Sequence, residues 1–132
     1  MGLDNGIIVK NKYKELLEEL GPDNWGDYKS KDDNDYDLCY WRKCWGIRNA
    51  IIKKFHFPET CGEYKLDLED IPVIIKILEG FCNSNNWEEY GDSIWEYDDY
   101  IHTLIEQIVN LKIFYKYWKK HPEIEVYFYD SY

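Results

Sequence analysis

Positive charge is scarce in this chain of 132 residues. Sixteen lysines and arginines stand against 26 aspartates and glutamates, which gives a formal net charge of −10. This balance disfavours attraction to nucleic-acid phosphates and to anionic membrane surfaces. We therefore expect neither a nucleic-acid duplex nor a membrane as a direct partner. The carboxylates are typical either of a solubilising surface or of a nucleic-acid mimic that blocks a nucleic-acid-binding protein, and both interpretations stay open.

Long apolar runs are also missing, and the first residues show no basic stretch followed by an apolar one. The sequence therefore predicts neither a transmembrane helix nor a secretory leader. Cys39, Cys44, Cys61 and Cys82 are spaced too irregularly for paired zinc knuckles, so we expect buried free thiols. Together these absences predict a protein of the reducing cytoplasm.

Signatures of catalysis are absent as well. The chain has no Gly-x-Ser-x-Gly elbow, no glycine-rich phosphate loop and no His-Glu-x-x-His motif. Its three histidines are scattered along the sequence. We therefore expect a non-catalytic protein without a cofactor.

Apolar and aromatic residues, in contrast, are plentiful. They make up 45% and 18% of the chain, enough to bury one core at this length. Periodicity, capping residues and turn signals predict an α+β fold that spans residues 1–132 as a single domain. We expect about four helices, at 12–20, 38–55, from 67 or 70 to 83, and 93–120, the last being long.

The expected β-structure lies mainly at the two ends of the sequence. Asp4-Asn5-Gly6 is a turn signal before a strand at 6–10, and residues 124–129 alternate as a last strand. We expect these strands to pair in a small antiparallel sheet supported by the helices. Residues 23–37 are expected to form a loop, and 64–66 a brief extended piece.

The chain has only two arginines, Arg42 and Arg48, and both lie in one segment rich in aromatic residues. A guanidinium stacks on rings and binds carboxylate or phosphate through two hydrogen bonds. The segment could therefore hold a small planar anion such as a nucleotide. The candidate ligand-binding residues are Tyr40, Trp41, Arg42, Trp45, Arg48 and Asn49. The helical spacing of Trp41 and Trp45 is also typical of core aromatics, and Arg48 could pair with an internal carboxylate instead of a ligand. Both interpretations stay open.

A second candidate site lies on the long helix. Asp98, His102 and Glu106 recur at four-residue steps, and carboxylates with an imidazole can bind a divalent metal or transfer protons. They form an incomplete ligand set without residues from elsewhere, so a solvated acidic face is the favoured interpretation. A metal-dependent phosphoesterase is therefore the third hypothesis for function, after the two binding roles given below.

The abundance of Tyr and Trp also bears on partners. These residues are enriched at protein interfaces, and the chain ends in Tyr127-Phe128-Tyr129-Asp130-Ser131-Tyr132. We therefore expect a homo-oligomer or a complex with another protein.

Four segments carry a family resemblance: Met1–Ile7, Tyr40–Trp45, Asn86–Glu96 and Val126–Tyr132. Together they resemble a family of small proteins encoded by bacteriophages and prophages. The resemblance implies action on host machinery, including host immunity, in the host cytoplasm, and it supplies no catalytic residue. Two roles follow as expectations: the first hypothesis is that the protein sequesters a nucleotide-derived immune signal like a sponge, and the alternative is that it blocks a host protein through the acidic surface.

Overall fold

Four strands form one sheet in which every neighbouring pair is antiparallel. The computed structural model describes residues 4–10, 36–42, 45–83 and 97–131. The strand order across the sheet is β2-β1-β4-β3. Their bounds are β1 Asp4–Val9, β2 Tyr36–Arg42, β3 Gly62–Leu66 and β4 Val126–Ser131.

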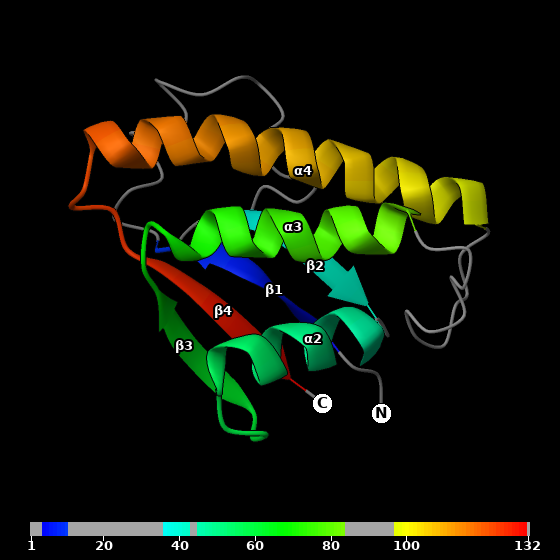
Figure 1. Ribbon diagram of the computed structural model, residues 1–132. Coiled ribbons are helices and arrows are strands. Elements are labelled where there is room, and N and C mark those ends of the chain that lie inside the picture. The colour runs from blue at the N-terminus through cyan, green and yellow to red at the C-terminus, as the bar shows by residue number, and fades with distance from the viewer. Residues whose placement is uncertain (1–3, 11–35, 43–44, 84–96, 132) are drawn as a thin grey trace.

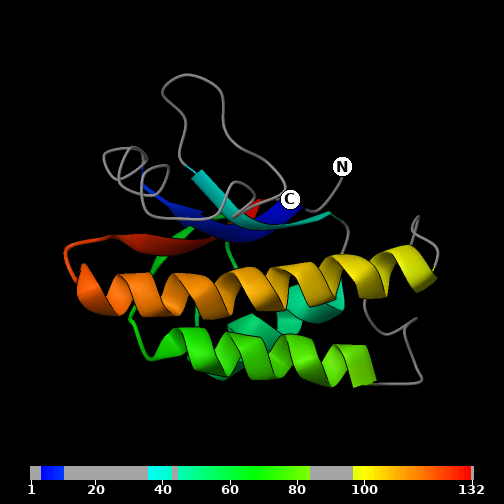
Figure 2. The same ribbon diagram turned by 90° about the horizontal axis from the view of Figure 1, so that it is seen from above.

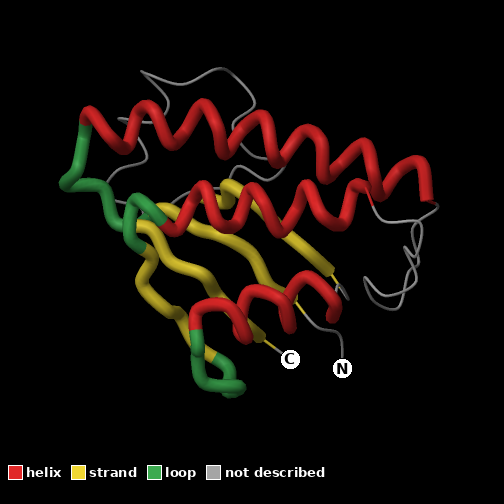
Figure 3. Tube along the Cα trace, in the orientation of Figure 1, coloured by secondary structure: helices red, strands yellow, loops and turns green. Residues whose placement is uncertain are grey.

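Three helices in the described part of the chain cover one face of this sheet (Figures 1 and 2). They are α2 Trp45–Phe55, α3 Asp70–Asn83 and α4 Tyr97–Lys120. Helix α3 lies between α2 and α4 (Figure 3). The sheet and the helices form the two layers of the fold (Figure 2). The core between the layers includes the fully buried side chains Ile7, Leu38, Trp41, Ile47, Ile51, Leu66, Ile71, Phe114 and Phe128. The predicted α+β class is confirmed; the expected helix at 12–20 lies outside the described residues.

The two chain ends meet in the middle of the sheet. Strand β1 pairs with β4 antiparallel, so Ile7 lies opposite Phe128 and Asn5 opposite Asp130. Side chains alternate between the two faces of a strand, so Asn5, Ile7, Phe128 and Asp130 all face the helices. The predicted pairing of the first and last strands is confirmed.

The expected helix at 38–55 is wrong in its first third. Residues 36–42 form strand β2, and the helix begins only at Trp45. The pairing of β2 with β1 shifts register between Ile7 and Ile8, which leaves Leu38 as an extra residue in β2. Such a bulge interrupts the two-residue alternation of a strand. It gave Leu38 and Trp41 a three-residue spacing that resembled a helical face.

The later elements follow the predictions closely. Pro72 lies in the first turn of α3, and the Asp70 carboxylate accepts the Asp67 backbone N–H at 2.7 Å, as in a capping box. Strand β3 is longer than the expected piece at 64–66. At the end of α2, His56 adopts a positive φ of 58°, and the Phe57 N–H donates to the Ile52 carbonyl, which closes the helix.

Gly6 is part of β1 and not of the turn that Asp4-Asn5-Gly6 suggested. An added Cβ there would lie 2.2 Å from the Cys39 carbonyl oxygen and 2.9 Å from Cε1 of Tyr129. The absence of a side chain therefore lets β2 and the Tyr129 ring approach β1 closely.

We predict that Gly6→Ala lowers the free energy of unfolding by about 2 kcal/mol, because backbone and ring atoms must shift to admit the methyl group. Urea denaturation measures the change. Gly80→Ala in α3 is the matched control: nothing lies within 4 Å of its Cβ, and it should be neutral or stabilising by up to about 1 kcal/mol. Equal stability of the Gly6→Ala variant and the wild type would contradict the close packing.

Candidate functional site

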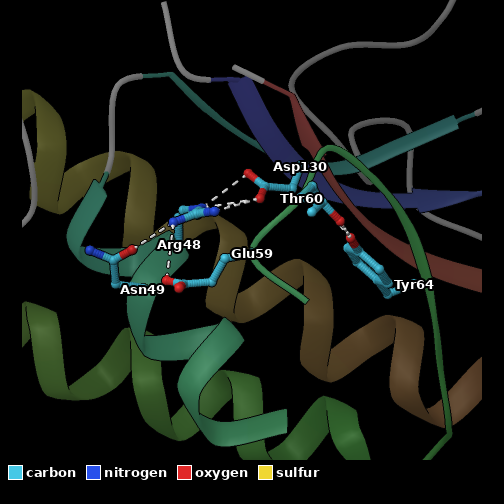
Figure 4. Close-up of polar contacts among 6 residues, drawn as sticks. All are labelled: Arg48, Asn49, Glu59, Thr60, Tyr64 and Asp130. Atoms are coloured by element: carbon cyan, nitrogen blue, oxygen red, sulfur yellow. Dashed lines mark hydrogen bonds and ion pairs between the residues drawn. The ribbon is translucent and has the colours of Figure 1, made fainter. Parts of the chain in front are cut away.

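Arg48 and Asp130 form a buried ion pair between α2 and β4 (Figure 4). The Arg48 Nε lies 3.2 and 3.1 Å from the two carboxylate oxygens, and Nη2 lies 3.0 Å from Oδ2. Both residues are at most 5% exposed. On its outer side Arg48 donates through Nη1 to Asn49 Oδ1 at 3.0 Å and lies 4.0 Å from the exposed Glu59 carboxylate. Asp130 therefore occupies Nε and Nη2, two donors with which this guanidinium could otherwise bind a ligand.

Two further buried polar residues are described, Asn5 on β1, next to β4, and Gln107 on α4. Asn5 is opposite Asp130 on one side and Trp41 on the other. Trp41 is fully buried, and its indole Nε1 donates to Gln107 Oε1 at 2.7 Å. The Asn5 amide is also fully buried, and neither of its polar atoms has a hydrogen-bond partner among the residues described. We call Asn5, Trp41, Arg48, Gln107 and Asp130 the polar centre.

The predicted ligand-binding residues divide between two elements and two faces of the sheet. Trp41 and Arg48 point into the polar centre, whereas the partly buried Tyr40 donates its hydroxyl to Asp4 Oδ1 at 2.5 Å. Asn49 is exposed beside Arg48. The side chains of Arg42 and Trp45 lie outside the described part. The ligand-binding role of this segment stays a prediction, and its described arginine is already paired internally.

The opposite face of the sheet holds a tyrosine in a strongly altered environment. Burial raises the pKa of the Tyr129 hydroxyl well above its usual value, and the nearby Asp37 carboxylate raises it further. Tyr40, Asp4 and Cys39 act in the same direction. The charged phenolate is thus disfavoured in the folded protein.

The predicted stripe on α4 is solvent-exposed where it is described. His102 Nε2 lies 3.3 Å from Glu106 Oε1, with 76% and 51% of the side chains exposed. The Asp98 side chain lies outside the described part. Within 4–10, 36–42, 45–83 and 97–131, no group of three or more His, Cys, Asp or Glu side chains is placed to hold a metal ion.

A groove lies at the end of the molecule where the β3–α3 turn meets the α4–β4 turn. It encloses about 240 Å³. Its floor includes Trp118 and Ile124, which are almost fully buried, and its border includes Asp67, Glu123 and Glu125 with Lys65 as the one cation. Three carboxylates against one ammonium give this groove a negative character. Analysis of the sequence missed it, because the two turns are far apart along the chain.

Among the cysteines that the structure describes, one has an exposed thiol. Cys39 is buried and Cys82 half-buried, as expected, but Cys61 is exposed in the turn before β3, so the prediction of burial is wrong there. No helix in the described segments is both long enough and apolar enough to cross a membrane.

Comparison with known proteins gives no relative for this chain: no protein-family model matches it, and neither a curated protein nor a solved structure is significantly similar.

We predict that Asp130→Asn lowers the free energy of unfolding by about 3–5 kcal/mol, because it leaves the Arg48 charge buried without a counter-ion. Chemical denaturation at neutral pH measures this loss. Glu63→Gln, which removes the exposed ion pair of Glu63 with Lys10, is the control and should cost less than about 1 kcal/mol. Losses of equal size would show that the Arg48–Asp130 pair is no more important than a surface contact.

We predict that Tyr129 makes stability fall with rising pH in the alkaline range. Its pKa is raised in the folded protein, so its contribution is complete below the unfolded value of about 10 and is lost as pH rises above it. Tyr129→Phe should therefore lose less stability than the wild type between pH 9 and pH 11, measured by urea unfolding at each pH. A parallel decline in both proteins would rule out this role.

Proposed function

We propose that this protein is a non-catalytic, acidic binding protein that attaches to a basic segment of a partner protein through the groove at the β3–α3 and α4–β4 turns. The observation that carries the proposal is the grouping of Asp67, Glu123 and Glu125 around an apolar floor. A cationic side chain fits both parts of such a groove, because carboxylates attract its charge and its aliphatic stem packs on apolar atoms.

Net charge supports the same type of partner. At −10, the whole molecule attracts a basic protein from a distance and repels an acidic one. Proteins that bind nucleic acids present lysine and arginine in this way. With the resemblance to phage proteins, the partner we propose is a host protein whose nucleic-acid-binding surface is blocked in the host cytoplasm, as a form of counter-defence.

Sequestration of a nucleotide-derived signal takes second place in this proposal. It requires a guanidinium that is open to a phosphate, and Arg48 already binds the carboxylate of Asp130 at three distances of 3.0–3.2 Å. An incoming phosphate would have to displace an internal counter-ion. The nucleotide hypothesis therefore depends on Arg42 and Trp45.

We predict that Glu123→Gln weakens binding of an arginine-rich peptide by roughly 3- to 10-fold, the effect of losing one charge pair of about 0.7–1.4 kcal/mol. Isothermal titration calorimetry at low salt measures the affinity. Glu106→Gln is a close control: Glu106 is exposed to a similar extent, 51% against 57%, and it too lies beside a histidine. This variant should bind like the wild type.

Two outcomes would remove the groove from the proposal. One is an equal effect of both substitutions, which would indicate attraction by net charge alone. The other is the absence of binding to the peptide at any salt concentration. Heat on adding a nucleotide, abolished by Arg42→Ala, would instead favour the sequestration hypothesis.

A further inference from the structure

The outer face of α4 carries two large apolar side chains in solvent. Ile105 and Val109 are 49% and 50% exposed, and they are the large hydrophobic residues most open to water in the described part of the chain. They lie four residues apart and therefore side by side on the helix. His102, Lys112 and Lys116 extend this row in both directions and are exposed as well. We call these five residues the α4 seam.

The seam runs along one face of α4. From His102 to Lys116 the steps alternate between three and four residues, which keeps all five on that face. Two of the five are apolar, so the seam can pack on a second helix over a short length. The opposite face of α4 already packs into the core through Leu104, Leu111 and Phe114. The seam is therefore a second contact face, directed away from the domain.

Charge is distributed unevenly along α4, and this distribution identifies the helix that fits the seam. The first half, residues 97–108, contains Asp98, Asp99 and Glu106 and no lysine or arginine. The second half, 109–120, contains four lysines and no acid. A matching helix must carry the reverse order of charge. The same helix turned end to end has that order, whereas a parallel copy would place lysine against lysine.

We propose that two copies of this chain associate through their α4 seams, antiparallel, about a two-fold axis between Ile105 and Val109. Ile105 of each copy then packs on Val109 of the other. Position 98 is seven residues before Ile105, and position 116 is seven residues after Val109. The axis therefore brings position 98 of one copy opposite position 116 of the other, twice in the dimer. The acidic groove lies outside this contact, so the association is independent of the proposed function.

A seam with two apolar residues per copy buries little surface, so the dimer should be weak and concentration-dependent. Part of its attraction is electrostatic, so added salt should weaken it further. Sedimentation velocity of the full chain at low salt, over a range of concentrations up to the millimolar, should show a monomer–dimer equilibrium that shifts to monomer at 1 M NaCl.

Charge reversal tests the orientation. Lys116→Asp and Asp98→Lys should each weaken self-association by at least about tenfold, because each creates two like-charge contacts. An equimolar mixture of the two variants should dimerise like the wild type, since every contact then joins opposite charges. Recovery on mixing separates a change at the interface from a failure to fold. Lys53→Asp on the exposed surface of α2 makes the same change in net charge as Lys116→Asp and should leave the dimer unchanged.

The proposal would be overturned by a wild-type protein that stays monomeric up to millimolar concentration at low salt. It would equally be overturned by a dimer that neither Lys116→Asp nor Ile105→Ser weakens. Variants that remain dissociated when mixed would exclude the antiparallel pairing.

Discussion

The ion pair between Arg48 and Asp130 is the interaction on which the arrangement of the helical layer depends. It joins the start of α2 to the last strand, 82 residues later in the sequence. An unpaired charge in this position would cost several kcal/mol, so the sheet and α2 must be positioned to bring the two groups together. Asn5 and Trp41 are on neighbouring strands, and Gln107 ties α4 to β2 through Trp41. The polar centre thereby links α2 and α4 to the sheet.

The same ion pair limits which ligands the surface can bind. A guanidinium that neutralises an internal carboxylate is no longer open to a phosphate ligand, so the described surface is left mainly with carboxylates and lysines. Carboxylates line the groove at the α4–β4 turn, and lysines occupy the second half of α4, which leads into that turn. The proposed basic partner and the proposed second copy would therefore contact different surfaces.

Local sequence patterns predict an element correctly where its buried face is regular. The capped start of α3 and the alternation of β4 each reflect a single regular face, and both are confirmed. Strand β2 was mistaken for helix because the bulge at Leu38 removes its alternation. No local signal reports a bulge, since it depends on the partner strand.

The ion pair itself had a signal in the sequence. Val126, Phe128 and Asp130 alternate along the last strand, so a carboxylate follows two apolar residues onto the buried face. A buried carboxylate requires a cation, and arginine is the usual one. The groove and the orphan amide of Asn5 had no such signal, because each is produced by segments that only the folded chain brings together.

The two-arginine composition allows a direct test of the central claim, that Arg48 is sealed inside the fold by Asp130. Each arginine gives one Nε–H resonance in a ¹⁵N NMR spectrum, so the chain should give two. After transfer to D₂O the Arg48 resonance should persist as long as the amides of the core strands, and an added nucleotide should not shift it. Immediate loss of that resonance, or a shift on adding nucleotide, would show that the guanidinium is open to solvent and to ligands, and would contradict the account.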